Sequence, residues 1–490
     1  MQTPDDPEIS KADTPTIPGN ASLRIWEALL PVLILMLLLA YNIFYADGVL
    51  LGDYSNQYIL LMGGLAAALV GFANKVGIRK MYTAILENLR SILVPIVILF
   101  LVGALAGTWL VSGIIPAMVY YGLLVLNPTI FLPASVVIAA IISIATGSSW
   151  TTSATVGIAL IGIGTALGIP AGMIAGAVIS GAYFGDKMSP LSDTTNLAPA
   201  MAGTDLFTHI RYMSYTTVPT ILIALCVFGL LSLGLDPSGA TDISRLLGAI
   251  EKAFTITPYL FIVPLSVIVL ILCKTKPLLA LGAGVLLAIV FALIFQPAVL
   301  ASLSDTAFQS LLQAILSDTA ITTDNELLAE LFSSGGMKGM LWTIFLIICA
   351  MVFGGVMEAI GALVKITDAL LKVASSIFGL FASTVVSCLG LNVIASDQYL
   401  AIVIPGKMFD KAYKDKGLAP ENLSRTLEDS GTVTSVLIPW NTCGAYQSSV
   451  LGVDVGSYMG YAIFNWLSPF MTLFFAAFRI RIRYALKKSS

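Results

Sequence analysis

Charge is scarce in this sequence. Asp, Glu, Lys and Arg make up 11% of the 490 residues and there is one histidine, whereas soluble domains carry roughly 25% charged residues. This deficit excludes an ordinary soluble domain, and a net charge of −3 without a strongly basic region argues against a nucleic-acid partner. The five cysteines show no CxxC spacing, so the sequence predicts neither a metal framework nor disulfides, and it indicates no cofactor.

Apolar residues replace the missing charge and form 57% of the chain. Their runs repeatedly exceed the roughly 20 residues that a helix needs to cross a hydrocarbon core. We therefore predict an all-α polytopic membrane protein with about twelve membrane-crossing or re-entrant elements. The run 25–45 lacks the small-residue cleavage site of a removable signal peptide and is interpreted as the first span.

The basic residues gather in short segments, and such segments are retained on the cytoplasmic side. They are Lys75, Arg79, Lys80 and Arg90; Lys274 and Lys276; Lys407, Lys411, Lys414, Lys416 and Arg425; and Arg479, Arg481, Arg483, Lys487 and Lys488. The connector 297–339 is acidic instead, with Asp305, Asp318, Asp324, Glu326 and Glu330 against Lys338. We expect this connector to face outward and both termini to be cytoplasmic.

Two parts of the chain share one layout at a nearly constant offset of 248 to 250 residues. The matching pairs are Gly107 and Gly355, Gly113 and Gly361, Ser148 and Ser396, Pro190 and Pro439, and Pro219 and Pro469. The first part follows a basic loop and the second follows the acidic connector, so their predicted membrane topologies are opposite. Inverted repeats with interrupted helices are typical of secondary transporters whose site lies near the membrane midplane.

The repeat predicts six regions along the chain. They are a cytoplasmic tail (1–24), N-terminal spans (25–90), repeat unit 1 (91–235), connecting spans with an outward polar loop (236–339), repeat unit 2 (340–483) and a basic C-terminal tail (484–490).

Four helix breaks are predicted, at 145–152, 185–195, 390–398 and 438–444. A break inside a bilayer is tolerated where the freed backbone groups line a cavity. Through the repeat, the first break corresponds to the third and the second to the fourth. Each unit is therefore expected to supply one hydroxyl-rich re-entrant hairpin tip and one unwound segment that starts at a proline.

The second break carries the most informative charges. No charged residue or histidine occurs between Arg90 and Asp186, after which Asp186, Lys187 and Asp193 appear close together. A carboxylate at the centre of a membrane helix costs about 2.5–3.5 kcal/mol, so a functional role is the default. The alternative is that this segment reaches the cytoplasmic surface, where Lys187 pairs with one of the acids. If the acids are buried, a proton and a sodium ion compete for the same oxygens.

Neutral oxygen ligands surround these acids. Sodium is a hard cation that prefers oxygen, and hydroxyls are available from Ser148, Ser149, Thr151, Ser189, Thr194 and Thr195. For any one of them, hydrogen bonding between helices is an alternative role. The second unit contributes Asn392, Asp397 and Asn441, and Asn441 aligns near Asp193. We therefore predict one shared site between the units, with Asp193 more central than Asp186.

Other polar residues have competing interpretations. Glu358, in a glycine-rich run, is a candidate proton carrier or the partner of a lysine. Glu428 and Asp429 are expected at a solvated helix end or in an ion pair with Arg425. His209 lies in an amphipathic stretch and is expected at the cytoplasmic surface.

The segments 147–152 (GSSWTT) and 184–196 (FGDKMSPLSDTTN), together with 439–442 (PWNT), resemble the NhaC family of bacterial sodium/proton antiporters, within the wider ion-transporter superfamily. The similarity extends from about residue 25 to 483. It implies a carrier, and no enzyme, that exchanges cytoplasmic sodium for external protons across the bacterial inner membrane. It further implies a scaffold part and a mobile part that moves as an elevator with two hairpins.

Several alternatives stay open. The family resembles members that exchange malate for lactate, so a sodium- and proton-coupled exchanger of small carboxylates or amino acids is the second hypothesis. The feature that would distinguish such an exchanger is a fixed cation in the cavity, and Lys187 is the nearby candidate. A channel or receptor is disfavoured because the chain shows no pore-filter motif and no output domain. Sodium against lithium or potassium, the stoichiometry and the oligomeric state, a homodimer included, are left undecided.

Overall fold

The computed structural model describes residues 22–46, 49–125, 127–235, 243–273, 275–323, 328–329 and 332–485. Outside these ranges lie most of the two predicted tails and six charged residues used to predict orientation: Lys274, Asp324, Glu326, Glu330, Lys487 and Lys488.

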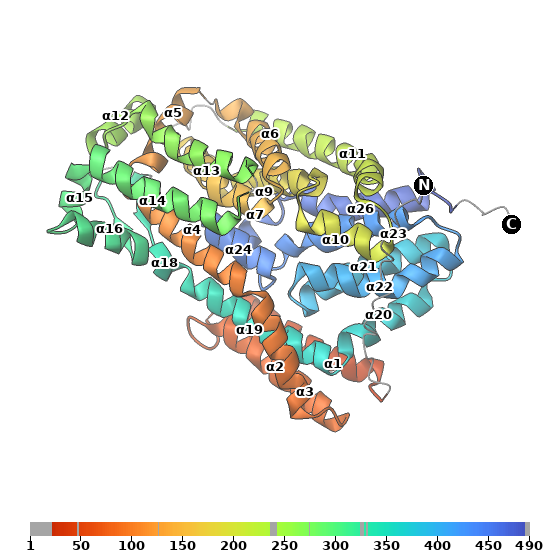
Figure 1. The fold of residues 1–490 in the computed structure, drawn as a ribbon. Helices are drawn as coiled ribbons and strands as arrows, with labels where there is room; N and C mark the ends of the chain where they lie inside the picture. Colours follow the sequence, from red (N-terminus) through yellow and green to blue (C-terminus); the bar gives the residue numbers. More distant parts are fainter. Residues whose placement is uncertain are drawn as a thin grey trace, which may run out of the picture.

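Helices form almost the whole of the described chain, as predicted (Figure 1). Eight of the described helical segments are long and apolar enough to cross a membrane, and up to ten if each of two bent pairs forms one span. α4 (Leu93–Val111), for example, contains no charged residue. A helix is favoured in a bilayer because it pairs its backbone N–H and C=O groups within one segment. The chain is therefore an all-α, multi-pass membrane protein.

The first predicted unit forms nine helical elements. They are α4, α5 (Ile114–Val125), α6 (Pro128–Thr146), α7 (Ser149–Thr152), η1 (Ser153–Gly157), α8 (Ile158–Ala166), α9 (Ala171–Met188), α10 (Asp193–Ala202) and α11 (Leu206–Leu233). The second unit forms α19 (Leu341–Ala359), α20 (Ala362–Val373), α21 (Ile377–Ile394), α22 (Gln398–Asp415), α23 (Pro420–Leu427), η4 (Glu428–Thr432), η5 (Ser435–Leu437), α24 (Thr442–Leu451), α25 (Val455–Tyr458) and α26 (Ile463–Ala477).

Element boundaries recur between the two units at the spacing seen in the sequence. α4 and α19 both contain 19 residues, and α10 and α24 both contain 10. Gly113 and Gly361, which each directly precede the second helix of a unit, have φ values of 76° and 79°. The units therefore share an order of elements. The opposite membrane topology of the second unit stays a prediction.

All four predicted helix breaks are confirmed. α6 ends before Gly147, α9 and α10 are separated by 189–192, α21 and α22 by 395–397, and η5 and α24 by 438–441. Gly147 in the first break has a φ of 70°, and Ser396 in the third break, which aligns one position later with Ser148, has a φ of 59°. A positive φ is uncommon for residues other than glycine, so the same backbone turn is present in both units.

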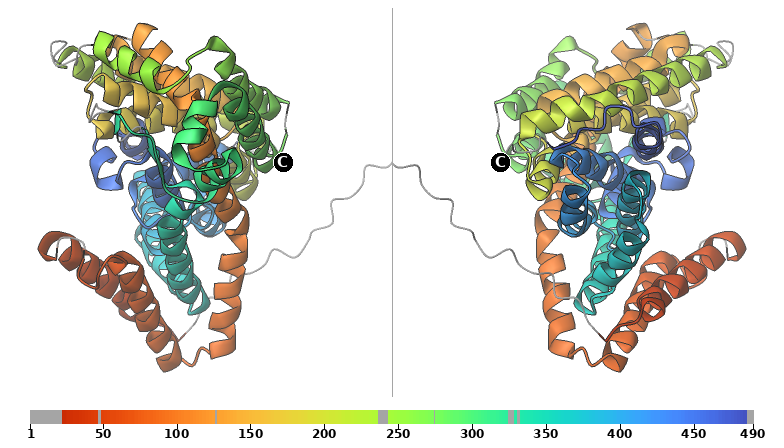
Figure 2. Two further views of the ribbon diagram at one scale, coloured as in Figure 1. Left: turned by 90° about the vertical axis from the view of Figure 1, so that its left-hand side faces the viewer. Right: turned by 90° about the vertical axis from the view of Figure 1, so that its right-hand side faces the viewer.

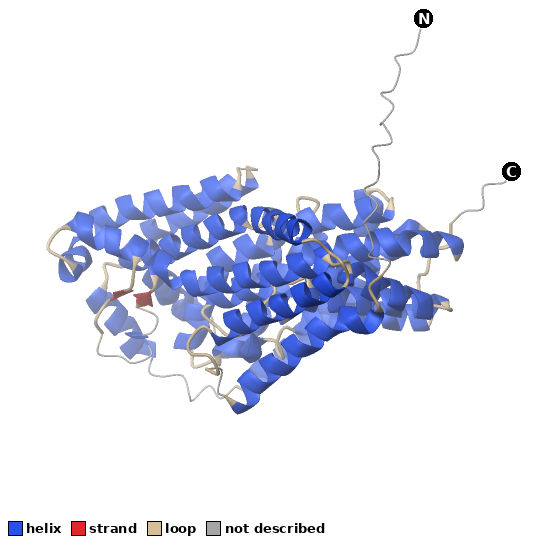
Figure 3. Ribbon diagram, turned by 90° about the horizontal axis from the view of Figure 1, so that it is seen from below, coloured by secondary structure: helices blue, strands red, loops and turns tan. Residues whose placement is uncertain are grey.

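The N-terminal helices α1 (Ile25–Tyr45), α2 (Ser55–Ala73) and α3 (Ile78–Ser91) pack against α19 and α20, and α1 and α2 extend away from the main body (Figure 2). The connector forms α12 (Ile243–Ala253), η3 (Pro258–Phe261), α13 (Ile262–Leu272), α14 (Pro277–Phe295), α15 (Pro297–Leu303), α16 (Ala307–Leu316) and α18 (Gly336–Gly339). Two short strands, β1 (Thr319–Ala320) and β2 (Ser333–Ser334), pair antiparallel there (Figure 3).

Close packing of α9 against α6 positions the second break. A Cβ atom at Gly185 would lie 2.5 Å from the carbonyl oxygen of Ala140, so only glycine permits this approach. Small residues at helix interfaces are typical of membrane bundles, where close backbone contact replaces the hydrophobic driving force. The contact brings Asp186, the next residue, next to the start of α7.

Candidate functional site

The first and second breaks lie against each other and hold Asp186 between them. The backbone N–H of Ser149 donates to Asp186 Oδ2 at 3.0 Å, and its hydroxyl donates to the same oxygen at 2.7 Å. Ser149 is the first residue of α7, so the half-buried carboxylate accepts from a helix N-terminus. Hydrogen bonds to a charged acceptor and the positive end of the helix dipole both stabilise an ionised carboxylate.

Three of the predicted hydroxyls around these breaks, those of Ser148, Ser189 and Thr195, bond to backbone groups. Ser148 caps α7 by accepting from the N–H of Thr151 at 3.2 Å, and it also accepts from the Thr151 hydroxyl at 3.1 Å. The Thr195 hydroxyl donates to the carbonyl oxygens of Asp186 and Lys187. Ser189, which is fully buried, accepts from the N–H of Leu191 at 3.3 Å. These residues therefore organise the breaks as well as lining them.

The third and fourth breaks are joined in the same way. Asn441 caps α24 and donates to the carbonyl oxygen of Asn392 at 3.0 Å. Asn392 in turn donates to the carbonyl oxygen of Gly431 and to the hydroxyl of Thr434. Asp397 caps α22 by accepting from the N–H groups of residues 399 and 400. The structure thus brings Asn392 and Asn441 together, while one oxygen of Asp397 is occupied as a helix cap.

The two pairs of breaks meet at an aromatic contact. The Trp150 ring stacks on the Tyr446 ring at 3.9 Å between centroids, and the Tyr446 hydroxyl donates to the carbonyl oxygen of Trp150. Asp186, Asp193 and Asp397 all lie within electrostatic range of the Tyr399 hydroxyl. Three predicted acids from both units therefore share one region.

Asp193 and Glu358 lie at the margins of this region. Asp193, expected to be the more central acid, is exposed in the first turn of α10, whereas Asp186 is half-buried. Asp186 is therefore more buried than Asp193, which is the reverse of the predicted order. Glu358 is half-buried on α19, within electrostatic range of Glu87 and Asp397. It forms no ion pair with a lysine among the described residues.

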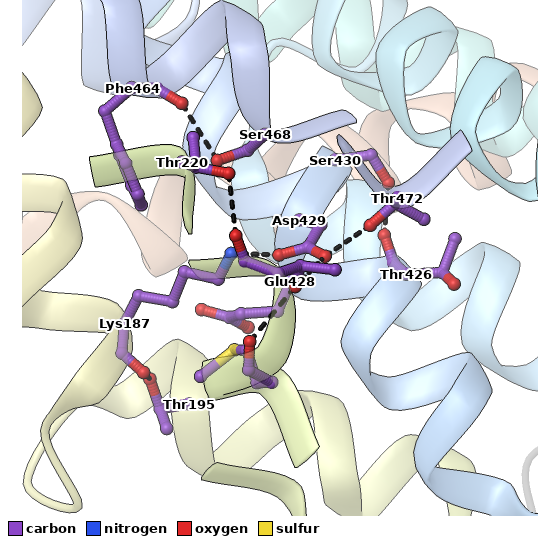
Figure 4. A network of polar contacts seen from close by, with 12 residues as sticks. Lys187, Thr195, Thr220, Thr426, Glu428, Asp429, Ser430, Phe464, Ser468 and Thr472 are labelled. Carbon is purple, nitrogen blue, oxygen red and sulfur yellow. Dashed lines mark hydrogen bonds and ion pairs between the residues drawn. The ribbon is translucent and has the colours of Figure 1, made fainter. Parts of the chain in front are cut away.

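A fully buried charge network crosses the interface between the units (Figure 4). Lys187 of unit 1 forms an ion pair with Asp429 of unit 2, and neither side chain has exposed surface. Asp429 also accepts from the hydroxyls of Thr216, at 2.9 Å, and Thr472. The alternative that Lys187 pairs with Asp186 or Asp193 is therefore wrong.

Glu428 lies beside this pair and is only partly hydrogen-bonded. Its Oε1 accepts from the Thr194 hydroxyl of unit 1 at 3.1 Å, whereas its buried Oε2 has no hydrogen-bond partner among the described residues. The Thr432 hydroxyl is adjacent, and Ser192 contacts Thr194 at 3.2 Å. A buried ionised carboxylate is unfavourable without a partner. A proton or a hard cation at Oε2 would supply one.

The interpretation of Glu428 and Asp429 as a solvated helix end or as partners of Arg425 is wrong. Both are fully buried, and neither forms an ion pair with Arg425. They precede a charge-free stretch, 430–453, and this signal could have placed them inside the membrane protein. Arg425 is itself fully buried against the Tyr212 ring at 4.5 Å, and its guanidinium has no hydrogen-bond partner in the described residues.

The surface placement of His209 is also wrong. Its side chain is fully buried, and Nδ1 lies 2.8 Å from the Ser424 hydroxyl. The amphipathic pattern of the first turn of α11 predicts a water-facing surface, but the polar face of α11 packs against α23. In a membrane protein a polar helix face also seeks other polar groups within the bundle.

Comparison with known proteins identifies the family. Residues 181–480 match the model of the Na⁺/H⁺ antiporter family. The chain belongs to this family. The match includes Asp186, Asp193 and the second unit up to residue 480.

Relatives in this antiporter family cover most of the chain. NhaC, a Na⁺/H⁺ antiporter of Alkalihalophilus pseudofirmus, is 40% identical over 84% of this chain and 87% of its own length. The arginine/ornithine antiporter ArcD of Halobacterium salinarum is 35% identical, over 88% of each chain. The malate-2H⁺/Na⁺-lactate antiporter of Bacillus subtilis is 34% identical, over 92% of each chain. The solved structure of Neisseria gonorrhoeae MtrF aligns over 93% of this chain and 95% of its own, with 13% identity and a TM-score of 0.35.

Proposed function

We propose that this protein exchanges sodium for protons across a membrane, with both ions using carboxylates at the interface between the two units. The observation that carries the proposal is the contact of unit 1 with the buried Glu428 carboxylate of unit 2. The Thr194 hydroxyl of unit 1 donates to Glu428 Oε1, and the hydroxyl of the next residue, Thr195, donates to the backbone carbonyl oxygen of Asp186, whose carboxylate accepts from the Ser149 hydroxyl. Membership of the Na⁺/H⁺ antiporter family, with NhaC as a relative, supports this function.

The chemistry of such a site follows from competition. A carboxylate that is buried away from water is stabilised either by a proton or by a cation. Sodium takes oxygen ligands, and the hydroxyls of Ser149 and Thr194 already contact the two carboxylates. In the proposed cycle, sodium enters when a proton leaves and the reverse step follows on the other side. Asp193, Asp397, Asn392 and Asn441 complete the proposed site, with Glu358 as a candidate proton carrier.

The direction of exchange is part of the proposal. We propose that both termini lie in the cytoplasm of a bacterium. In this orientation the carrier exports sodium in exchange for external protons across the inner membrane. The N–H of Ala419 donates to the carbonyl oxygen of Arg483 at 3.0 Å. This contact supports placing the basic segment 407–416 and the basic C-terminal end on the same side of the membrane, as the retention of basic loops requires.

Everted membrane vesicles with a fluorescent pH dye test the proposal. Addition of sodium should collapse an imposed pH gradient with the native protein and with Asp410→Asn, a half-buried control acid that pairs with the exposed Lys414. Asp186→Asn and Glu428→Gln, present at the same level in the membrane, should abolish the response. Native exchange rates in both variants would reject these carboxylates as the site.

A second function is exchange of small carboxylates or amino acids coupled to sodium and protons. The relatives ArcD and the malate-2H⁺/Na⁺-lactate antiporter favour it. The fixed cation expected for such an exchanger, Lys187, is neutralised by Asp429, which weakens this hypothesis. Arg425 is the buried cation that would have to replace it. A response of the same vesicles to malate, lactate or arginine that is lost in Arg425→Gln would establish the second function.

A further inference from the structure

A basic cavity lies between α1 and α20, away from the carboxylates of the proposed exchange site. Its volume is about 540 Å³, and the ionisable residues that line it are Arg24, Lys365, Lys372 and Asp368. α1 and α20 lie next to each other at the lower right of Figure 1. Three cations therefore face one carboxylate in a space large enough for a small-molecule group.

Among the described residues that line this cavity, cations outnumber carboxylates. Lys372 Nζ pairs with Asp368 Oδ2 at 2.6 Å, which uses the single carboxylate of the lining. Arg24 and Lys365 form no ion pair within the described part of the chain. Two cationic side chains are thus available to an anion. Guanidinium and ammonium groups together are the usual ligands of phosphate oxygens.

The position of the cavity matches the boundary between lipid chains and headgroups. Arg24 directly precedes α1, and the first residues of α1 present Ile25 and Trp26 at the surface, 38% and 57% exposed. A tryptophan beside a basic residue at the start of an apolar helix is typical of the headgroup level of a bilayer. Val373, next to Lys372, is 77% exposed. A ligand held here would therefore have apolar surface beside it and cations around it.

The cavity also lies at the basic end of the molecule. Lys416 Nζ donates to the carbonyl oxygen of Ser375, which follows α20. The same basic segment continues to Ala419, which contacts the C-terminal Arg483. The retention of basic segments places this end on the cytoplasmic side, where the leaflet carries anionic lipids.

From these observations we propose that the cavity binds the headgroup phosphate of an anionic phospholipid of the cytoplasmic leaflet. Arg24 and Lys365 contact the phosphate, and the lipid chains lie along the exposed apolar residues of α1. The bound lipid links α1, outside the two units, to α20 of unit 2. This site is independent of the ions that the protein exchanges.

The test uses the full-length protein purified in detergent and measures bound lipid by native mass spectrometry. Phosphatidylglycerol is the probe, phosphatidylcholine is the zwitterionic control and inorganic phosphate is the headgroup-free control. Phosphatidylglycerol should bind in preference to phosphatidylcholine. Lys365→Gln should lower its affinity about fivefold, which corresponds to about 1 kcal/mol for one basic residue near anionic lipid. Arg24→Gln should have a similar effect.

Lys414→Gln is the matched control, because Lys414 forms the same i,i+4 ion pair with Asp410 that Lys372 forms with Asp368, but outside the cavity. It should bind lipid like the native protein. Ala369→Trp fills the cavity without changing its charge and should also reduce lipid binding. This variant therefore tests the proposal even if one of the charge variants fails to fold. Equal lipid binding in all variants, or binding of inorganic phosphate with the same dependence on Lys365 and no lipid preference, would overturn the proposal.

Discussion

Removal of one partner of the Lys187–Asp429 pair is expected to destabilise the protein strongly. Both side chains are fully buried, and breaking a buried pair on one side costs about 3–5 kcal/mol because a charge is left without a partner. In Lys187→Met, the Asp429 carboxylate keeps the hydroxyls of Thr216 and Thr472 as donors. We therefore expect this variant near the lower end of the range.

Asp429→Leu should be the more damaging single change. The Lys187 ammonium would then lose its ion-pair partner and keep the Phe464 ring, 5.6 Å away, with the Glu428 carboxylate nearby. Its cost is expected near the upper end, about 5 kcal/mol. The double variant Lys187→Met/Asp429→Leu removes both charges, and it should lie within about 1–2 kcal/mol of the native protein, since apolar replacement of a buried pair is often neutral or favourable.

The assay is unfolding in mixed micelles with increasing dodecyl sulfate, followed by the fluorescence of the six tryptophans. The four proteins of the double-mutant cycle are compared. Lys414→Met is the control for a surface pair, because Lys414 is 61% exposed and such pairs contribute about 0.3–0.5 kcal/mol. Single variants as stable as the Lys414→Met control, or a coupling energy below about 0.5 kcal/mol, would refute the claim that this pair joins the units.

Two further predictions concern the turns around α10. Gly147→Ala should lose more stability than Gly203→Ala in the same assay: both glycines have positive φ, which costs other residues about 1–2 kcal/mol, but only a Cβ at Gly147 meets Leu191, at 2.6 Å. A smaller loss for Gly147→Ala would contradict the contact between the first two breaks. Hydrogen bonds from the hydroxyl and N–H of Thr208 hold the pKa of Asp205 below its ordinary value of 3.8. The stabilisation from this cap is therefore present above pH 3.8 and is lost as pH falls through the lower folded-state pKa. The difference in stability between the native protein and Asp205→Ala should accordingly shrink on acidification. A difference that does not change with pH would contradict the capping role of Asp205.

Local patterns were sufficient to predict the helices and their interruptions. Uncharged runs such as 91–111 specify membrane helices because no other isolated segment satisfies its own backbone in lipid. Gly147, Pro190 and Pro439 marked three of the breaks, because glycine permits a left-handed turn and proline ends a helix. The offset between Gly113 and Gly361 likewise indicated a repeated order of elements.

Partners across the interface between the units could not be predicted in this way. The sequence places Lys187 and Asp429 242 residues apart, and no periodicity relates them. Sequence alone predicts Glu428, Asp429 and His209 at the surface, because charge near a basic loop usually faces water. Their burial depends on where η4 and α11 pack, which only long-range contacts determine.

What the sequence by itself determined is the membrane-spanning helical class, the four breaks and the set of acids and hydroxyls beside them, because these follow from composition and from local backbone chemistry. The tertiary structure decided which of these groups meet. It joined Asp186 to the N-terminus of α7 and Thr194 to Glu428, and it neutralised Lys187 with Asp429. The physical reason is that a buried charge is stable only beside a suitable partner, and partners drawn from separate units are brought together by the packing of whole helices.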